Sequence, residues 1–295
     1  MLDNPAGLGG GAREIWALIK DAANGWSEHH ASRIGAALAF YTVFSLGPIL
    51  LLAVVVAGFF FGRGNAQGEI HQQINNLIGP QAAAEVQLLL ARAHRPTAGV
   101  VATAISVVTL LLSADTALVE LKSGLDEIWS VPAASRRWYW DYLRTRLLSI
   151  ALILSLGGLL LASLLFGAAL GALEALSRGI FIVGMFLRWT SALLSFGLAV
   201  LLFATVYKVL PSVRLAWKDV AAGALITAVL FTVGKYAIGV YLGSSTVAST
   251  YGAAGSVIVV LLWVYYSAQV FLLGAEFTRG YACRFGSRRG MVTPS

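Results

Sequence analysis

Six long apolar runs alternate with more polar segments along the chain. They occupy about 34–62, 98–118, 147–172, 180–207, 220–242 and 252–275. A helix needs roughly 20 residues to cross the hydrocarbon core of a bilayer, so each run is long enough to form a span. Because lipid cannot satisfy exposed backbone groups, we expect each run to be an α-helix. The pattern therefore predicts an all-α protein, a polytopic membrane bundle of about six helices.

The segments between the runs define the domain organisation. We expect an N-terminal segment at 1–33, one membrane domain at 34–276 and a basic tail at 277–295. The long segment 63–97 repeats apolar residues at helical spacing around Gly79-Pro80, which predicts two short amphipathic helices that form an outer cap. Pro48 lies inside the first run and should kink that helix.

The N-terminal segment does not have the pattern of a signal peptide. Its apolar residues Ile15, Trp16, Leu18 and Ile19 lie close together on a helix, so this segment is able to rest on the membrane surface. Further along, the segment 113–146 is rich in aromatic residues. These predict a belt at the level of the headgroups, formed by Trp129, Trp138, Tyr139, Trp140 and Tyr142.

Composition supports the membrane assignment, since 58% of the 295 residues are hydrophobic and only 12% are charged. The formal net charge of +7 is distributed unevenly. Fifteen Lys and Arg residues lie in the N-terminal segment, the second and fourth connections and the tail, whereas four lie on the opposite side. The positive-inside rule then places both termini in the cytoplasm. This distribution explains the basic balance without a nucleic-acid partner.

Two cations fall inside predicted spans. Arg188 lies about eight residues into the fourth span, and Lys235 lies about seven residues from the outer end of the fifth. A charge at this depth is costly and usually faces a partner, a cavity or water. The pair is therefore a candidate anion site for a phosphate or carboxylate group. Alternatively, both side chains extend outward to the headgroups.

A line of polar residues follows the second span at a mean spacing near 3.4 residues, so its members share one helix face. It is a candidate polar pathway, although the hydroxyls could instead bond to their own helix and let neighbouring helices approach. Asp115 stands beside this line. The line comprises Thr103, Ser106, Thr109, Ser113, Thr116, Glu120, Ser123 and Glu127.

Charged residues also gather at the cytoplasmic ends of the spans. Glu276 closes the last span, with Gln269 about two turns earlier, and Asp219 opens the fifth. If these residues join Arg33 and Lys122 in a buried network, they would form a gate or a proton relay. Ordinary charge pairing at the membrane interface is the alternative.

Chemistry of other kinds finds little support in the sequence. The histidines His29, His30, His71 and His94 lie in loops or in the N-terminal segment, without a Cys or carboxylate at ligand spacing. The single cysteine, Cys283, offers no disulfide within the chain. We therefore expect no metal, no cofactor, no catalytic residue and no enzyme activity.

Four blocks of sequence resemble the YihY/BrkB family of bacterial inner-membrane proteins, which includes UPF0761-type proteins. They are AALAFYTVFSLGPILLL at 36–52, LKSGLDEIW at 121–129, LPSVRLAWKDVAAGALITAVL at 210–230 and YGAAGSVIVVLLWVYYSAQVFLLGAE at 251–276. The chain departs from the family pattern at Asp126, where Asn is usual, and at Gly47. The resemblance implies a six-helix protein of the inner membrane, connected with export of envelope lipid or solute. Some relatives bear a ribonuclease BN label, which no metal or catalytic cluster in this sequence supports.

These features favour a transporter or translocator of a lipid-like or amphipathic anionic substrate. Two alternatives stay open: a small-solute exporter, or a non-transporting scaffold that docks envelope proteins through segment 63–97. We expect membrane lipids as partners, and envelope proteins or a second copy of the chain are compatible with the sequence.

Overall fold

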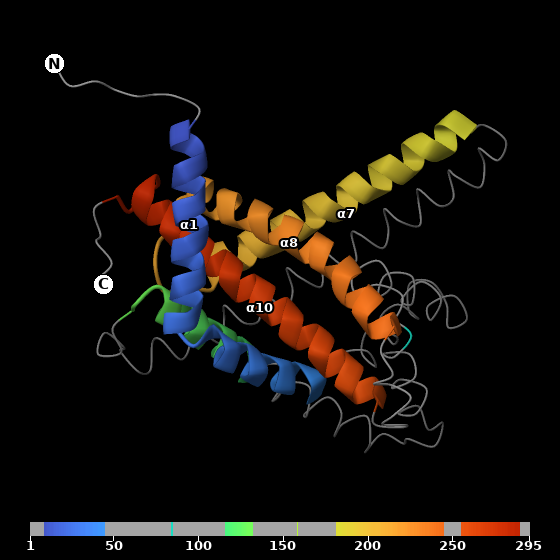
Figure 1. Ribbon diagram of the computed structural model, residues 1–295, viewed down its shortest axis with the longest axis horizontal. Helices are drawn as coiled ribbons and strands as arrows, with labels where there is room; N and C mark the ends of the chain where they lie inside the picture. The colour runs from blue at the N-terminus through green and yellow to red at the C-terminus, as the bar shows by residue number, and fades with distance from the viewer. Residues whose placement is uncertain are drawn as a thin grey trace.

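The computed structural model describes residues 9–44, 84, 116–131, 158, 181–244 and 255–289. Within these residues all regular structure is helical, which confirms the all-α prediction. The four labelled helices of Figure 1 are α1 (Gly9–Glu28), α7 (Phe181–Val209), α8 (Trp217–Ser244) and α10 (Gly255–Arg284). Two further helices span Ala31–Phe44 and 116–128.

Three of the described helices are long and apolar enough to cross a membrane. The spans are Trp189–Val209 in α7, Trp217–Tyr241 in α8 and Val257–Arg284 in α10. They overlap the predicted spans 180–207, 220–242 and 252–275. The predicted spans 98–118 and 147–172, the cap 63–97 and the part of 34–62 that contains Pro48 lie almost wholly outside the described residues.

The connection between α7 and α8 begins near Pro211, which cannot continue a helix. Lys208 in the last turn of α7 and Asp219 in the first turn of α8 match the polarity of the two helix ends. The ammonium group of Lys208 donates a hydrogen bond to the carbonyl oxygen of Leu215 and lies 5.3 Å from the ring centre of Trp217. Lys208 thus ties the connection to both helices.

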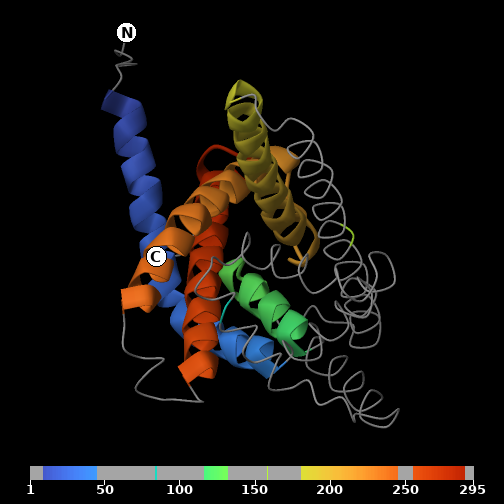
Figure 2. The ribbon, with the colours of Figure 1, turned by 90° about the vertical axis from the view of Figure 1, so that its right-hand side faces the viewer.

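The described helices converge at one end and diverge at the other. Figures 1 and 2 show α7 and α8 meeting at the connection 210–216 and separating toward Phe181 and Ser244. Helix α10 packs along α8, and α1 packs against the C-terminal part of α10. We call the convergent region, formed by the end of α7, the start of α8 and the end of α10, the basic end.

The hydrophobic core lies at this basic end. Its largest fully buried apolar side chains come from four parts of the chain. They are Leu125 and Ile128 of segment 116–131, Tyr207 of α7 with Leu210 of the connection after it, Val220 of α8 and Leu272 of α10. Helix Ala31–Phe44 adds Ile34 and Leu38 to the same core. Five separate parts of the chain are therefore packed together where the helices converge.

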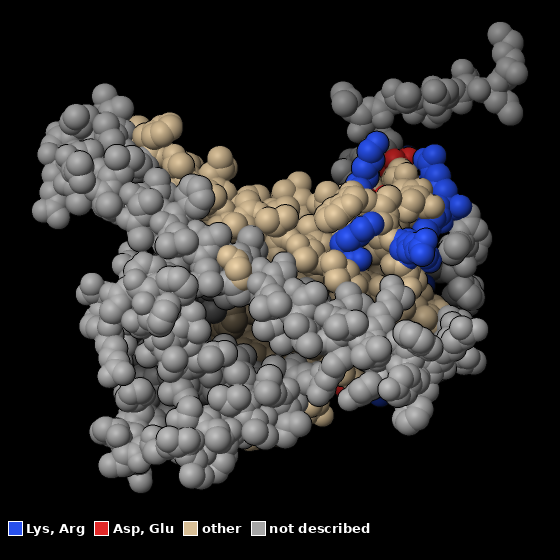
Figure 3. All heavy atoms as spheres, turned by 180° about the vertical axis from the view of Figure 1, so that it is seen from behind, with Lys and Arg blue, Asp and Glu red and all other residues tan. Residues whose placement is uncertain are grey.

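Away from the basic end, large apolar side chains are exposed. They include Phe186, Trp189 and Leu193 on α7 and Val233 and Tyr236 on α8. Figure 3, which shows the molecule from behind, shows the complementary pattern in charge, with Lys and Arg gathered at the end where the helices converge. A basic end beside largely apolar helices is typical of a protein that emerges from a bilayer on one side.

Helix α1 has an apolar face that is only partly used within the protein. Leu18 and Ala22 are buried against Phe277, whereas Trp16 and Ile19 are exposed. Trp16 and Ile19 thus keep the apolar surface that the sequence assigned to membrane contact.

For Trp129 the predicted place in a headgroup belt is wrong. Its ring is buried in the core, and the guanidinium group of Arg288 lies 5.7 Å from the ring centre. The other four residues of that predicted belt lie outside the described part of the chain.

Candidate functional site

Helices α8 and α10 cross through two reciprocal pairs of glycine and threonine. A Cβ added to Gly274 would lie 2.9 Å from Cβ of Thr227, and one added to Gly223 would lie 2.8 Å from Cβ of Thr278. Each threonine hydroxyl donates to the carbonyl four residues earlier in its own helix, at 2.8 Å for Thr227 and 2.7 Å for Thr278. Small residues at these four positions let the two antiparallel backbones approach closely.

Tyr207 joins α7 to this crossing. Its buried hydroxyl donates a hydrogen bond of 2.7 Å to the carbonyl oxygen of Phe271, on α10, and lies 2.9 Å from Oγ1 of Thr227, on α8. The ring of Tyr207 also stacks on that of Phe271, with 4.9 Å between the ring centres. One side chain thus connects three helices through neutral contacts.

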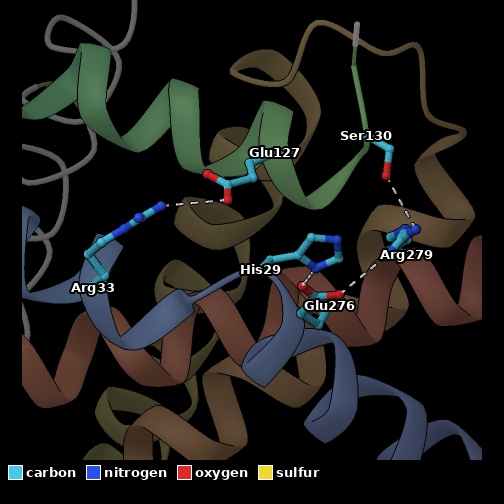
Figure 4. A network of polar contacts seen from close by, with 6 residues as sticks. All are labelled: His29, Arg33, Glu127, Ser130, Glu276 and Arg279. Atoms are coloured by element: carbon cyan, nitrogen blue, oxygen red, sulfur yellow. Dashed lines mark hydrogen bonds and ion pairs between the residues drawn. The ribbon is translucent and has the colours of Figure 1, made fainter.

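A second group of contacts, which is ionisable, joins α10 to the N-terminal part of the chain (Figure 4). Nδ1 of His29 lies 2.6 Å from Oε1 of Glu276. On the other side of the carboxylate, Nη1 of Arg279 lies 3.8 Å from Oε2, and Nη2 donates to Oγ of Ser130 at 3.5 Å. Gly25 makes room for the carboxylate, because a Cβ there would lie 2.5 Å from Oε2.

This pair is well shielded from solvent, with side chains exposed by 17% for His29 and 2% for Glu276. The hydrogen bond to Glu276 raises the pKa of His29 above 6.5, against an opposing effect of burial. His29 therefore keeps its proton, and the ion pair its charge, to a higher pH than an exposed histidine would.

Segment 116–131 is attached to the connection after α7 by a third cluster. Nζ of Lys122 lies 2.6 Å from Oδ2 of Asp126 and donates to Oγ of Ser212, also at 2.6 Å. Oδ1 of Asp126 accepts a bond of 2.7 Å from the main-chain N–H of Ser212. The carboxylate of Asp126 thus holds two segments together.

The end of the described chain returns to the start of α8. The buried carboxylate of Asp219 accepts hydrogen bonds from the main-chain N–H of Ser287 at 3.0 Å and from its hydroxyl at 2.6 Å. Arg284, in the last turn of α10, pairs with Asp21 of α1. The end of α10 and the residues after it therefore bind both α1 and α8.

The four residues predicted as a gate or relay are distributed over separate contacts. Glu276 pairs with His29, Lys122 with Asp126, and Asp219 with Ser287. Arg33 lies 3.9 Å from Glu127, and both side chains are largely exposed. These contacts surround the same end of the bundle, and a gate at this position stays a prediction.

The other predicted site residues are only partly described. Lys235 is half-buried on α8, 5.3 Å from the ring centre of Tyr236, while the side chain of Arg188 lies outside the description. In the polar pathway, Thr116 is exposed and Glu120 is partly exposed, on the side of segment 116–131 away from the core. The residues Thr103, Ser106, Thr109, Ser113 and Asp115 are not described.

Sequence reasoning missed several residues of this region. His29, Tyr207 and Ser287 were not predicted to pair with the span ends. The glycine–threonine crossing did leave a signal, since Gly-x-x-x-Thr occurs in both helices, at 223–227 and 274–278. Among the described residues, no three His, Cys, Asp or Glu side chains form a group able to hold a metal.

The geometry defines a helical membrane protein that is closed at its basic end by neutral and ionisable contacts. The chain belongs to the family described as Virulence factor BrkB, which matches residues 22–291. It is 28% identical over 253 residues to a UPF0761 membrane protein of Alkalilimnicola ehrlichii, covering 84% of this chain and 54% of the relative. A UPF0761 membrane protein of Tolumonas auensis is 33% identical over 178 residues, covering 60% of this chain and 56% of the relative.

A third relative, UPF0761 membrane protein RSc1559 of Ralstonia nicotianae, is 27% identical over 269 residues, which is 89% of this chain and 58% of the relative. The chain thus spans little more than half the length of these curated relatives. No solved structure matches it.

Proposed function

We propose that this protein is a transporter that moves a lipid-like or amphipathic anion across or within the bacterial inner membrane. The observation that carries the proposal is the asymmetry of the bundle. Helices α7, α8 and α10 are joined by buried contacts of Tyr207, Thr227 and Thr278 at the basic end, and α7 and α8 diverge toward their other ends. Alternating access includes a state in which the helices are packed together on one side of the membrane and apart on the other.

The orientation follows from the distribution of charge. The basic end carries the Lys and Arg residues of α1, of the connection 210–216 and of the tail, so we assign it to the cytoplasm, with both termini. The closed side then faces the cytoplasm, and the diverging stretches of α7 and α8 face the outer leaflet.

The chemistry of the diverging stretches suggests the class of substrate. Aromatic and aliphatic side chains such as Phe186, Trp189 and Tyr236 are exposed there, and they suit acyl chains. Arg188 and Lys235 lie on the same stretches, and a cation at this depth is retained when it meets an anionic group. Apolar surface together with positive charge fits a lipid with an anionic headgroup.

The test uses vesicles that contain the purified protein and a dye-labelled lipid in each leaflet. We expect the protein to speed the movement of labelled phosphatidylglycerol between leaflets more than that of labelled phosphatidylcholine. The double variant Arg188→Gln, Lys235→Gln should lower the rate roughly tenfold, which corresponds to about 1.4 kcal/mol. The matched control Arg214→Gln, Lys218→Gln removes two exposed cations of the basic end and should keep the rate.

Equal lipid movement in vesicles with and without protein would refute the proposal. An equal loss in both double variants would refute the assigned anion site. If a water-soluble anion crosses while neither lipid moves, the small-solute exporter is the better reading.

A further inference from the structure

The N-terminal part of the chain covers one side of α10. We call α1, the joint at His29 and His30, and helix Ala31–Phe44 the N-terminal cover. Along it, Gly25 lies against Glu276 and Gly35 lies against Gln269. Figures 1 and 2 show the cover beside α10 over much of the length of that helix. Since residue numbers rise on one partner and fall on the other, the cover runs antiparallel to α10.

Beneath the cover, α10 presents two polar side chains on one face. Gln269 and Glu276 are seven residues apart, which is close to two helical turns. Both amide atoms of Gln269, Oε1 and Nε2, are buried without a hydrogen-bond partner. The side chain lies directly under Gly35, where an added Cβ would be 3.1 Å from Cδ. A buried amide without partners costs free energy, so the covered arrangement is strained at this point.

The cover is fastened close to a joint in its own backbone. His30 has a φ of 49°, in the left-handed region that a residue other than glycine adopts at a cost. This residue separates α1 from helix Ala31–Phe44, and the preceding residue, His29, makes the contact with Glu276. The fastening contact therefore acts where the cover is able to bend.

The contacts of α10 with its other neighbours are of a different kind. Tyr207, Thr227 and Thr278 hold α7, α8 and α10 together through buried neutral hydrogen bonds and close backbone packing. Protonation does not change these contacts near neutral pH. The three long helices form the fixed part of the basic end. The cover is attached to α10 by apolar side chains such as Leu18 and Ala22 and, in addition, by a titratable pair.

From this geometry we propose that the N-terminal cover is a gate, held shut by protonated His29 on Glu276 and released when His29 loses its proton. Release lets the cover bend at His30 and move away from α10. Gln269 and Glu276 then meet water from the basic end and become polar groups on the route of the substrate. The role in substrate access rests on the proposed function, whereas the movement of the cover does not.

The sign of the pH effect follows from the contacts. Because the pKa of His29 is raised in the closed arrangement, its contribution to closure is complete below about pH 6.5 and is lost as pH rises through the raised value. Arg279 lies on α10, three residues after Glu276, and opposes protonation of His29, but its guanidinium group is itself 3.8 Å from the carboxylate of Glu276. Alkaline conditions at the basic end should therefore open the gate.

The remaining charged groups around the pair are bound to other residues or exposed. Arg33 of helix Ala31–Phe44 lies near Glu127 of segment 116–131. Arg284 binds Asp21 farther along α1. On α8, Asp219 is held by Ser287, and Glu28 of α1 is exposed. His29 is thus the group among these whose ordinary range of titration lies nearest to neutral pH.

The experiment measures distances by pulsed electron spin resonance on the full chain in lipid nanodiscs. Spin labels are attached at Lys20→Cys on α1 and Lys218→Cys on α8, both exposed positions, in a Cys283→Ser background. We expect one short distance at pH 6 and a second, longer population at pH 9. If the pKa of His29 differs by one unit between the closed and open arrangements of the cover, the ratio of closed to open molecules changes up to tenfold with pH. A label pair at Leu193→Cys and Lys218→Cys, within α7 and α8, should not respond to pH.

Two histidine variants complete the test. His29→Asn keeps a side-chain nitrogen near the position of Nδ1 but cannot titrate, so its distances should not depend on pH. His30→Asn changes the adjacent exposed histidine and should keep the response, since asparagine tolerates a positive φ.

Two results would overturn the gate. One is an equal distance at pH 6 and pH 9 in the spin-labelled protein that keeps His29, and the other is a pH response that persists in His29→Asn. If lipid moves in the vesicle assay without any change in distance, the gate is wrong and the transporter stands. If the distance changes while no substrate moves, the gate stands and the transporter is wrong.

Discussion

Replacing Gly274 by alanine tests the crossing of α8 and α10. The added Cβ would lie 2.6 Å from the Tyr207 hydroxyl and 2.9 Å from Cβ of Thr227, and still closer to its Oγ1. Forcing a methyl group into a packed contact costs about 1–3 kcal/mol, and displacing one buried hydrogen bond adds about 1 kcal/mol. Alanine is the better helix former, by about 1 kcal/mol. We expect a net loss of about 1–3 kcal/mol in the free energy of unfolding.

The assay is equilibrium unfolding in mixed micelles as the fraction of dodecyl sulfate is raised. Gly197→Ala on α7 is the matched control, because an added Cβ there meets no atom within 4 Å. It should be neutral or stabilising by up to about 1 kcal/mol. A second comparison adds Thr227→Ala to Gly274→Ala, which removes the nearest clashing atom and should give a coupling energy of about 1–2 kcal/mol. Equal stability of Gly274→Ala and the parent protein would refute the reasoning, and so would the absence of coupling.

Two further substitutions probe the other contacts of the basic end in the same assay. Tyr207→Phe should lower the free energy of unfolding by only about 1–2 kcal/mol, because Thr227 and the main-chain carbonyl on α10 keep partners within their own helices. A loss above about 4 kcal/mol would contradict this. Lys122→Met should lower the free energy of unfolding by about 2–3 kcal/mol, because it leaves the partly buried Asp126 without its cation. The control Lys20→Met, at an exposed position, should change it by less than about 0.5 kcal/mol. Equal effects of the two lysine changes would show that the ion pair contributes nothing.

The long helices were predictable because their signal lies within each segment. Apolar runs near 180–207, 220–242 and 252–275 are sufficient to define helices of spanning length, and α7, α8 and α10 lie over them. The polar residues at their ends were also visible in the sequence. Asp219 opens α8, and Glu276 lies near the end of α10, where the structure finds both buried.

Partners across the fold were not predictable in the same way. His29 and Glu276 are separated by 247 positions, and helical spacing carries no information about which distant residue will face a carboxylate. Trp129 illustrates the opposite error. An aromatic residue beside a span was assigned to the headgroups by composition, but in the structure it packs beneath Arg288 in the core.

The glycines show what a pattern within one helix is able to reveal. Gly223 and Gly274 each precede a threonine by four residues, so each helix could be predicted to pack closely against something. That the two motifs face each other depends on the antiparallel register of α8 and α10, which neither sequence segment specifies alone.

The contact between His29 and Glu276 also dictates when the basic end can form during synthesis. His29 emerges 247 residues before its partner Glu276, which takes roughly 12–50 s at about 5–20 residues per second. Asp219 likewise waits for Ser287, which lies beyond the last span. These contacts of the basic end therefore form only after α10 has been synthesised. A ribosome that stops before Ser287 would leave the buried carboxylate of Asp219 without its two hydrogen bonds to that residue.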